Sequence, residues 1–110
     1  MNNWIITGRL TKDPETTGTQ TGNVLTKIYM AVRRDYKNKE TNQYDSDFYL
    51  FKAFGKTADY IYMHIKKGDL VEIQGRPINN NFEKNGEMIY RDDYIIQSIS
   101  RLSSRKELNA

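Results

Sequence analysis

Aromatic and cationic side chains share one face of the segment from Phe48 to Gly55. Because side chains alternate between the two faces of a strand, Phe48, Leu50, Lys52 and Phe54 lie on the same side. A charged Lys52 at this parity indicates a face open to solvent, where two large rings flank a cation. Rings of this kind stack on the bases of a single nucleic-acid strand, and cations contact its phosphates. The alternative is that both rings pack beneath one of the chain's own loops.

A second aromatic residue lies among cations just before this segment. Four cations surround Tyr36 between Arg33 and Lys39, at the start of a polar stretch, residues 35–47, that we expect to be a long exposed loop. Interleaved rings and cations favour a loop that wraps around a single strand. An ordinary solvated loop that carries a tyrosine is the alternative.

The cations that could contact phosphates form a set rather than a single motif. Any one of them alone is more often a solvated surface charge, and the net charge of +3 favours an anionic partner only weakly. The candidates are Arg9, Arg33, Arg34, Lys37, Lys52, Lys56, Arg76 and Lys84.

The residues that catalysis or metal binding requires are sparse. His64 is the only histidine and has no evident partner, and the chain has no cysteine. Asp92 and Asp93 are adjacent, so a strand would point them to opposite faces, and Asp45 and Asp47 lie at the end of a loop. We therefore expect no enzymatic activity, no metal ion and no cofactor.

Composition also bears on the compartment. The lack of cysteine fits a reducing cytoplasm. The first residues show no basic leader followed by an apolar run, and no segment approaches the roughly 18 apolar residues of a membrane span. We expect a cytoplasmic protein that does not associate with membranes.

Five segments show the alternation or the β-branched and aromatic content of strands. In the first of them Trp4 shares its parity with Ile6 and Leu10, which places it in the core or a subunit interface rather than against a base. The segment from Thr16 to Asn23 is expected to be a loop, and Asn85-Gly86 is expected to form a hairpin turn. The five expected strands are residues 4–10, 24–33, 48–55, 70–78 and 88–99.

One helix is expected between the third and fourth strands, because apolar residues recur there at i, i+3, i+4 and i+7. They are Ala58, Ile61, Tyr62 and Ile65. Its last turn is expected to hold Lys66 and Lys67, followed by Gly68 as the C′ residue. Three strands, one helix and two strands is the order of the all-β OB-fold, a five-stranded Greek-key barrel. We expect residues 1–100 to form this domain and 101–110 a short polar basic tail.

Three segments carry a resemblance to a known family. They are Asn2–Glu15 (NNWIITGRLTKDPE), Phe54–Ala58 (FGKTA) and Lys66–Arg76 (KKGDLVEIQGR). Over residues 2–100 the chain resembles the bacterial and phage-type single-stranded DNA-binding proteins. The resemblance implies that Tyr36, Phe48, Phe54 and Phe82 are base-stacking residues, although Phe82 could by its sequence alone belong to the core.

The resemblance also implies what the chain does. We expect sequence-independent binding and protection of single-stranded DNA in replication, recombination, repair or transfer, by a homo-oligomer that is a tetramer or, alternatively, a dimer. An OB-fold module that contacts protein or oligosaccharide is the runner-up, and a metal-dependent nuclease is a third option that lacks its carboxylate cluster.

Two features depart from the family pattern. Trp4 replaces the usual small aliphatic residue. Cellular members usually end in a Gly/Pro-rich linker and an acidic tip with a terminal Phe, whereas the last ten residues here carry three cations and one anion. We therefore do not expect tail-mediated recruitment of other proteins, and the short form suggests a phage or mobile element.

Overall fold

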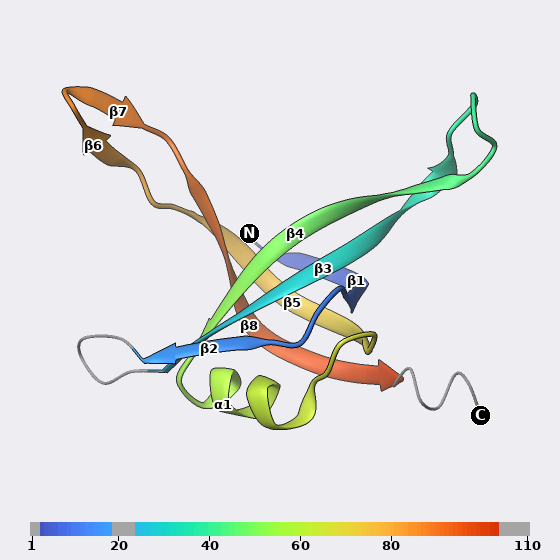
Figure 1. Cartoon of the computed structure of the whole chain (residues 1–110), viewed down its shortest axis with the longest axis horizontal. Helices are drawn as coiled ribbons and strands as arrows, with labels where there is room; N and C mark the ends of the chain where they lie inside the picture. Colours follow the sequence, from blue (N-terminus) through green and yellow to red (C-terminus); the bar gives the residue numbers. More distant parts are fainter. Residues whose placement is uncertain (1–2, 19–23, 104–110) are drawn as a thin grey trace.

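The barrel is formed by five long strands, which surround one apolar core (Figure 1). The computed structural model describes residues 3–18 and 24–103. The strands follow the order β1-β5-β8-β4-β3, and β3 returns to β1 through Arg9↔Ala31 and Leu10↔Met30, which closes the barrel. They are β1 (Trp4–Leu10), β3 (Val24–Lys37), β4 (Tyr44–Phe54), β5 (Leu70–Asn79) and β8 (Asp92–Ser103). Helix α1 (Gly55–His64) lies between β4 and β5 in the chain and covers one end of the barrel, so the expected OB-fold is confirmed.

Strand alternation sorts the side chains of β3 and β4 between core and surface. In the antiparallel pair, Ile28 lies opposite Phe51 and both are buried, whereas Lys27 lies opposite Lys52 on the outer wall. Residues directly opposite each other share a face, so the inner and outer rows stay separate from Leu25↔Phe54 to Arg33↔Ser46, beyond which the register shifts. Ala58 and Ile61 of α1 close the core at the barrel's end.

Trp4 lies on the inner face, as its parity predicted. It is half-buried, stacks on Tyr94 with 5.1 Å between ring centroids, and meets Tyr49 edge-on at 6.5 Å. Its neighbour Ile5 is 66% exposed on the outside. Because the indole is held within this aromatic cluster, we expect its fluorescence to change little when DNA is added; strong quenching would place it against a base.

Gly8 lies where β1 crosses closest to β3. A Cβ at Gly8 would lie 2.5 Å from the carbonyl oxygen of Ala31, which is backbone and cannot move aside alone. Only a residue without a side chain lets the two strands approach and close the barrel.

We expect Gly8→Ala to lower the free energy of unfolding by roughly 1–3 kcal/mol through overpacking. Gly18→Ala is the matched control, since a Cβ added at Gly18 would have no atom within 4 Å. Urea denaturation of both variants measures the difference. Equal stabilities for the two would contradict the role given to Gly8.

Several element boundaries differ from those expected. The region 35–47 is mostly strand, because β3 runs to Lys37 and β4 starts at Tyr44, which leaves only a short turn. Within 16–23, β2 (Glu15–Gly18) pairs with β3, and residues 19–23 lie outside the described part. The single strand expected at 88–99 is interrupted at Tyr90 and Arg91, which separate β7 (Glu87–Ile89) from β8. Of the expected tail, residues 101–103 belong to β8 and residues 104–110 lie outside the described part.

The helix ends earlier than expected. It stops at His64, and the extended backbone of Ile65 precludes the predicted last turn with its lysines. The backbone N–H of Lys66 donates to Asp69 Oδ2 at 2.8 Å and that of Lys67 to Asp13 Oδ1 at 2.8 Å, so carboxylates replace helical acceptors. Tyr62, expected on the apolar face, is 55% exposed.

Candidate nucleic-acid interface

The outer wall of β3 and β4 carries the two rings that the sequence placed on an open face. Phe48 is 73% exposed and Phe54 is 47% exposed, so both rings face solvent as predicted and neither is covered by a loop of the described chain. Between them along β4 lie Leu50 and Lys52. Directly opposite on β3, in order from the Phe48 end, lie Ala31, Tyr29, Lys27 and Leu25. The wall thus presents two rings separated by an apolar patch and a pair of lysines.

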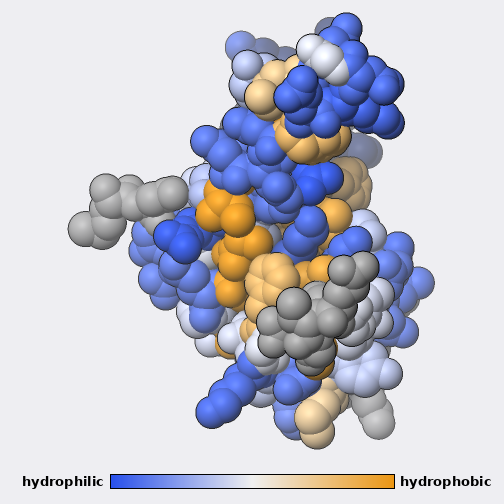
Figure 2. Space-filling model, turned by 90° about the vertical axis from the view of Figure 1, so that its left-hand side faces the viewer, coloured by the Kyte–Doolittle hydropathy of each residue, from blue (hydrophilic) through white to orange (hydrophobic). Residues whose placement is uncertain are grey.

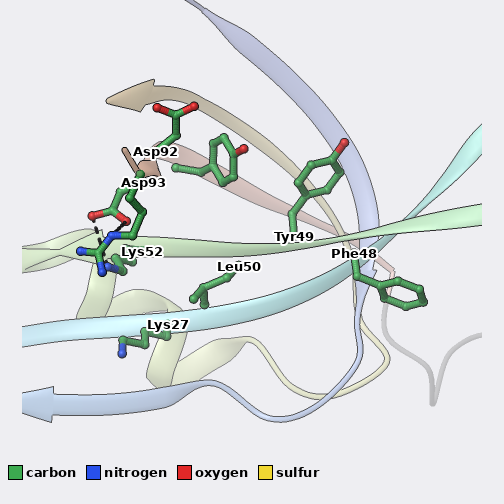
Figure 3. Close-up of a pocket in the computed structure, with 9 residues that line it drawn as sticks. Lys27, Phe48, Tyr49, Leu50, Lys52, Asp92 and Asp93 are labelled. Atoms are coloured by element: carbon green, nitrogen blue, oxygen red, sulfur yellow. Dashed lines mark ion pairs between the residues drawn. The ribbon is translucent and has the colours of Figure 1, made fainter. Parts of the chain in front are cut away.

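A groove of about 430 Å³ follows this wall between β4 and the start of β8. Figure 3 shows Phe48 at one end and Lys27 with Lys52 at the other, with Leu50 between them. Arg91 and Asp93 also line the groove, and Asp93 lies at the same end as Lys52. Cations grouped beside an apolar floor suit a chain whose charged phosphates alternate with flat bases.

A second hollow, of about 560 Å³, lies beyond Phe48. It is lined by Arg9 of β1, Arg33 of β3 and Ser46 of β4, among others. Ala31, which lines this hollow, lies opposite Phe48, which lines the groove, so the two lie on neighbouring parts of the β3–β4 wall. A single strand that crosses Phe48 would therefore meet cations on both sides.

The side of the molecule that carries the β6–β7 hairpin shows apolar atoms on its surface. In Figure 2 a band of hydrophobic residues crosses the otherwise hydrophilic face below the projecting hairpin. The exposed large hydrophobic residues of the described chain include Phe48, Phe54 and Phe82. Contiguous exposed apolar surface marks interaction sites in many proteins.

Three of the predicted phosphate contacts, Arg9, Arg34 and Lys52, are held by the protein's own polar groups, Lys52 through its Nζ at 3.3 Å from Asp93 Oδ2. Arg9 Nη1 donates to the carbonyl oxygen of Gly68 at 3.0 Å, which fixes the turn before β5. Arg34 binds Asp47 through two nitrogens, with the shortest distance 2.8 Å. This bidentate hydrogen bond raises the pKa of Arg34 and lowers that of Asp47. The pair is exposed, and Asp47 occupies the Nε and Nη2 donors of Arg34, which are then not available to a phosphate.

Tyr36 lies on the long hairpin that β3 and β4 extend beyond the barrel (Figure 1). Its ring is 66% exposed. The same hairpin holds Tyr44, whose ring lies 4.6 Å from the Arg33 guanidinium and 5.8 Å from the Lys37 ammonium. The sequence interpretation left Tyr44 in a loop; its pairing with Lys37 across the hairpin brings ring and cations together.

Phe82 lies on a small second hairpin, β6 (Phe82–Lys84) and β7 (Glu87–Ile89), and is 41% exposed. The predicted Asn85-Gly86 turn is confirmed, with φ of 55° and 79°. The Arg91 guanidinium lies 5.6 Å from the Phe82 ring. The possibility that Phe82 belongs to the core is therefore wrong.

Three more predicted cations are exposed, and none has an ion pair within residues 3–18 and 24–103. Lys56 lies in the first turn of α1, Arg76 on the outside of β5 and Lys84 beside the hairpin turn. Arg76 lies opposite Ile95 of β8, two strands from Lys52, so it extends the basic wall away from β3. Lys56 and Lys84 lie on separate elements.

Lys27, Arg91 and Tyr44 are the residues that sequence reasoning missed. Lys27 carried a usable signal, because it alternates in phase with the outer face of β3. Arg91 had none, since its place beside Phe82 and Asp93 depends on how the hairpin joins the barrel.

In the described chain no helix is long and apolar enough to cross a membrane. The described residues also hold no cluster of three or more side chains suited to a metal ion.

Comparison with known proteins identifies the family. A model described as the single-strand binding protein family matches residues 1–102. The chain belongs to this family. A relative from Staphylococcus epidermidis named single-stranded DNA-binding protein is 31% identical over 109 residues, which cover 99% of this chain and 82% of the relative. Single-stranded DNA-binding protein 3 of Listeria innocua is 34% identical over 96% of this chain and 66% of its own length.

The family's fold is shared by solved structures. The wild-type single-stranded DNA-binding protein from Thermus aquaticus superposes with a TM-score of 0.80 at 20% sequence identity, over 96% of this chain and 52% of that one. A relative from Malacoplasma penetrans is 35% identical, and this chain spans only 56% of its length. The chain thus spans only about half to two thirds of the length of several relatives that it matches.

Proposed function

We propose that this protein binds single-stranded DNA without regard to sequence and protects it during replication, recombination or repair. The observation that carries the proposal is the exposed pair Phe48 and Phe54 on one wall, with Lys27 and Lys52 between them. Every base has a π-face, so stacking on these rings tolerates any sequence, and the lysines hold the phosphates between stacked bases. The names of the relatives support the same ligand. The function is binding alone, without catalysis, and its compartment is the cytoplasm.

Other rings extend the binding path at both ends. The β3–β4 hairpin, which carries Tyr36, and the β6–β7 hairpin, which carries Phe82, project to either side of the barrel (Figure 1). A strand that stacks on Phe48 and Phe54 would be long enough to reach both hairpins, since a single OB-fold occupies about 4–16 nucleotides. We assign Tyr36, Phe48, Phe54 and Phe82 as the stacking residues.

The protein acts as a homo-oligomer. From Trp4 to Gly8, β1 pairs with β5 on one side only, and its other edge has no strand partner among the described residues. Beside this edge Ile5 is 66% exposed. Two copies that pair along β1 would cover the edge and the apolar side chain by one symmetric contact. A dimer of such dimers would give a tetramer.

Titration with dT oligonucleotides at two salt concentrations tests the proposal. About five phosphate contacts at roughly 0.7 each give a slope of log affinity against log salt near −3.5, so a fourfold rise in salt should weaken binding roughly 100-fold. Fluorescence anisotropy of a labelled strand measures this. Absence of binding at low salt, or affinity that does not respond to salt, would refute the proposal; the second result would favour a protein or oligosaccharide ligand.

A further inference from the structure

The β6–β7 hairpin is joined to the barrel by a short irregular segment. The β5–β8 ladder ends at Asn79↔Asp92, and the hairpin's own ladder starts at Phe82↔Ile89. In between, the Asn80 N–H donates to the Arg91 carbonyl at 2.7 Å, and the Arg91 N–H donates to Asn81 Oδ1 at 3.1 Å. Two strands of three residues are marginal by themselves, so the direction in which the hairpin projects depends on this joint.

One carboxylate connects the joint to the barrel wall. Asp93, whose side chain is 11% exposed, accepts a hydrogen bond from Asn80 Nδ2 at 2.8 Å. Its oxygens also lie 3.3 Å from Lys52 Nζ and 3.5 Å from Arg91 Nε. Figure 3 marks the ion pairs of Asp93 with dashed lines and shows its carboxylate beside Lys52, at the end of the groove away from Phe48.

These contacts keep Asp93 ionised. Partial burial acts to raise the pKa of its carboxyl group, but the hydrogen bonds from Asn80 and Lys52 and the charges of Lys52 and Arg91 outweigh burial and lower the pKa. A permanent negative charge in a groove for a polyanion repels phosphates. The carboxylate therefore opposes binding by its charge alone, and its contribution must come from what it holds in place.

Asp93 reaches Phe82 through Arg91. The Arg91 guanidinium contacts the Asp93 carboxylate and also lies 5.6 Å from the Phe82 ring, so one side chain links the barrel to the hairpin's aromatic residue. Asn80 supplies a second link from the joint. Loss of the carboxylate would free both, and the hairpin could then swing about residues 80–81 and 90–91.

We propose that Asp93 is a positioning residue that holds the β6–β7 hairpin at a fixed angle over the groove, so that Phe82 meets a strand already stacked on Phe48. The inference rests on the proposed function. It predicts that Asp93 contributes to binding only while the Phe82 ring is present, which a charge effect or a general structural effect would not require.

The test is a double-mutant cycle with Asp93→Asn and Phe82→Ala, followed by dT affinity at constant salt. Each single variant should bind roughly fivefold or more weakly, the lower end of what one stacking ring contributes. In the Phe82→Ala background, Asp93→Asn should change affinity less than about twofold, because the ring it positions is gone. Thermal melting confirms that each variant is folded at the assay temperature.

Asp92→Asn is the matched control. Asp92 lines the same groove, and its variant loses the same charge, but within the described residues its side chain has no hydrogen bond or ion pair; only its backbone pairs, opposite Asn79. It should bind equally or slightly more tightly, and by the same factor with or without Phe82. Asn80→Ala removes the link to the joint and leaves the groove's charge unchanged, so it should show the same Phe82-dependent loss as Asp93→Asn.

The outcomes separate clearly. Asp93→Asn and Asp92→Asn could change dT affinity by the same factor, both with Phe82 present and in the Phe82→Ala variant. The carboxylate would then act by charge alone, and the positioning role would be overturned. An equal loss of dT affinity for Asp93→Asn with and without the Phe82 ring would overturn the positioning role as well. If the unmodified protein fails to bind dT at all, the proposed function falls, a result distinct from a binding protein whose cycle shows no coupling.

Discussion

Replacing Phe48 and Phe54 together with alanine is expected to weaken dT binding by roughly 2–6 kcal/mol, because each stacking ring contributes about 1–3 kcal/mol per base. The two rings are exposed at opposite ends of one wall, so each can stack on its own base, and their losses should nearly add. The measurement is the affinity for a dT strand by fluorescence anisotropy, for the single variants and the double variant.

The same variant should keep its stability. Phe48 is 73% exposed and Phe54 47% exposed, and neither belongs to the buried core, so their removal opens no cavity in that core. Phe51, on the inner face of β4, is 1% exposed. Phe51→Ala is expected to lower the free energy of unfolding by about 3–5 kcal/mol. Tyr62→Ala, at an exposed aromatic position on α1, is the control for binding and should leave dT affinity unchanged. A large drop in melting temperature for the double variant would mean that the rings are structural.

The sequence was sufficient to predict the outer wall because strand alternation is a local property. A charged residue at Lys52 could not face the core, so every residue of the same parity on β4 had to face outward, Phe48 and Phe54 included. The barrel order followed from the same logic, since five strand patterns with one amphipathic helix after the third leave few topologies. Local patterns also gave the Asn85-Gly86 turn.

Contacts between distant residues could not be predicted in this way. Arg34 is held by Asp47, 13 residues away, and Lys52 by Asp93, which is in contact only because β4 and β8 meet as a parallel pair. Neither partner is visible in the spacing of charges along the chain. These pairs determine which cations are free to contact phosphates. The sequence therefore predicts which wall of the barrel carries the site better than it predicts which cations take part.

The sequence-based prediction was wrong at the polar ends of β3 and β4 for a different reason. Beyond Arg33 the hairpin leaves the barrel and has no core to face, so its residues show no apolar alternation even though they pair across the hairpin. β2 was missed for the same reason, because its four residues are all exposed and pair only with β3. Hydrophobic periodicity reports burial, and strands without burial give no such signal.

Ile5→Lys is expected to reduce the assembly to a monomer of 12.9 kDa and to weaken binding of long strands about 10²–10⁴-fold. The unpaired edge of β1 and the exposed Ile5 beside it form the surface that we assign to self-association. A lysine on an edge strand opposes pairing with a second copy, because two like charges would meet across the symmetric contact. Mass in solution and affinity for a strand of about 60 nucleotides, several times the site of one OB-fold, measure the two effects.

A strand of about 10 nucleotides distinguishes loss of assembly from damage to the barrel, since it fits within the site of one OB-fold. It should bind Ile5→Lys about as well as the unmodified protein, because the stacking wall of each barrel is unchanged. Met63→Lys is the control, an equally exposed apolar residue on α1 at 67% against 66% for Ile5. It should keep both the mass and the affinity for the long strand. A monomeric unmodified protein would contradict the assignment, and so would an Ile5→Lys variant that remains assembled, because the β1 edge would then not be the surface that holds the copies together.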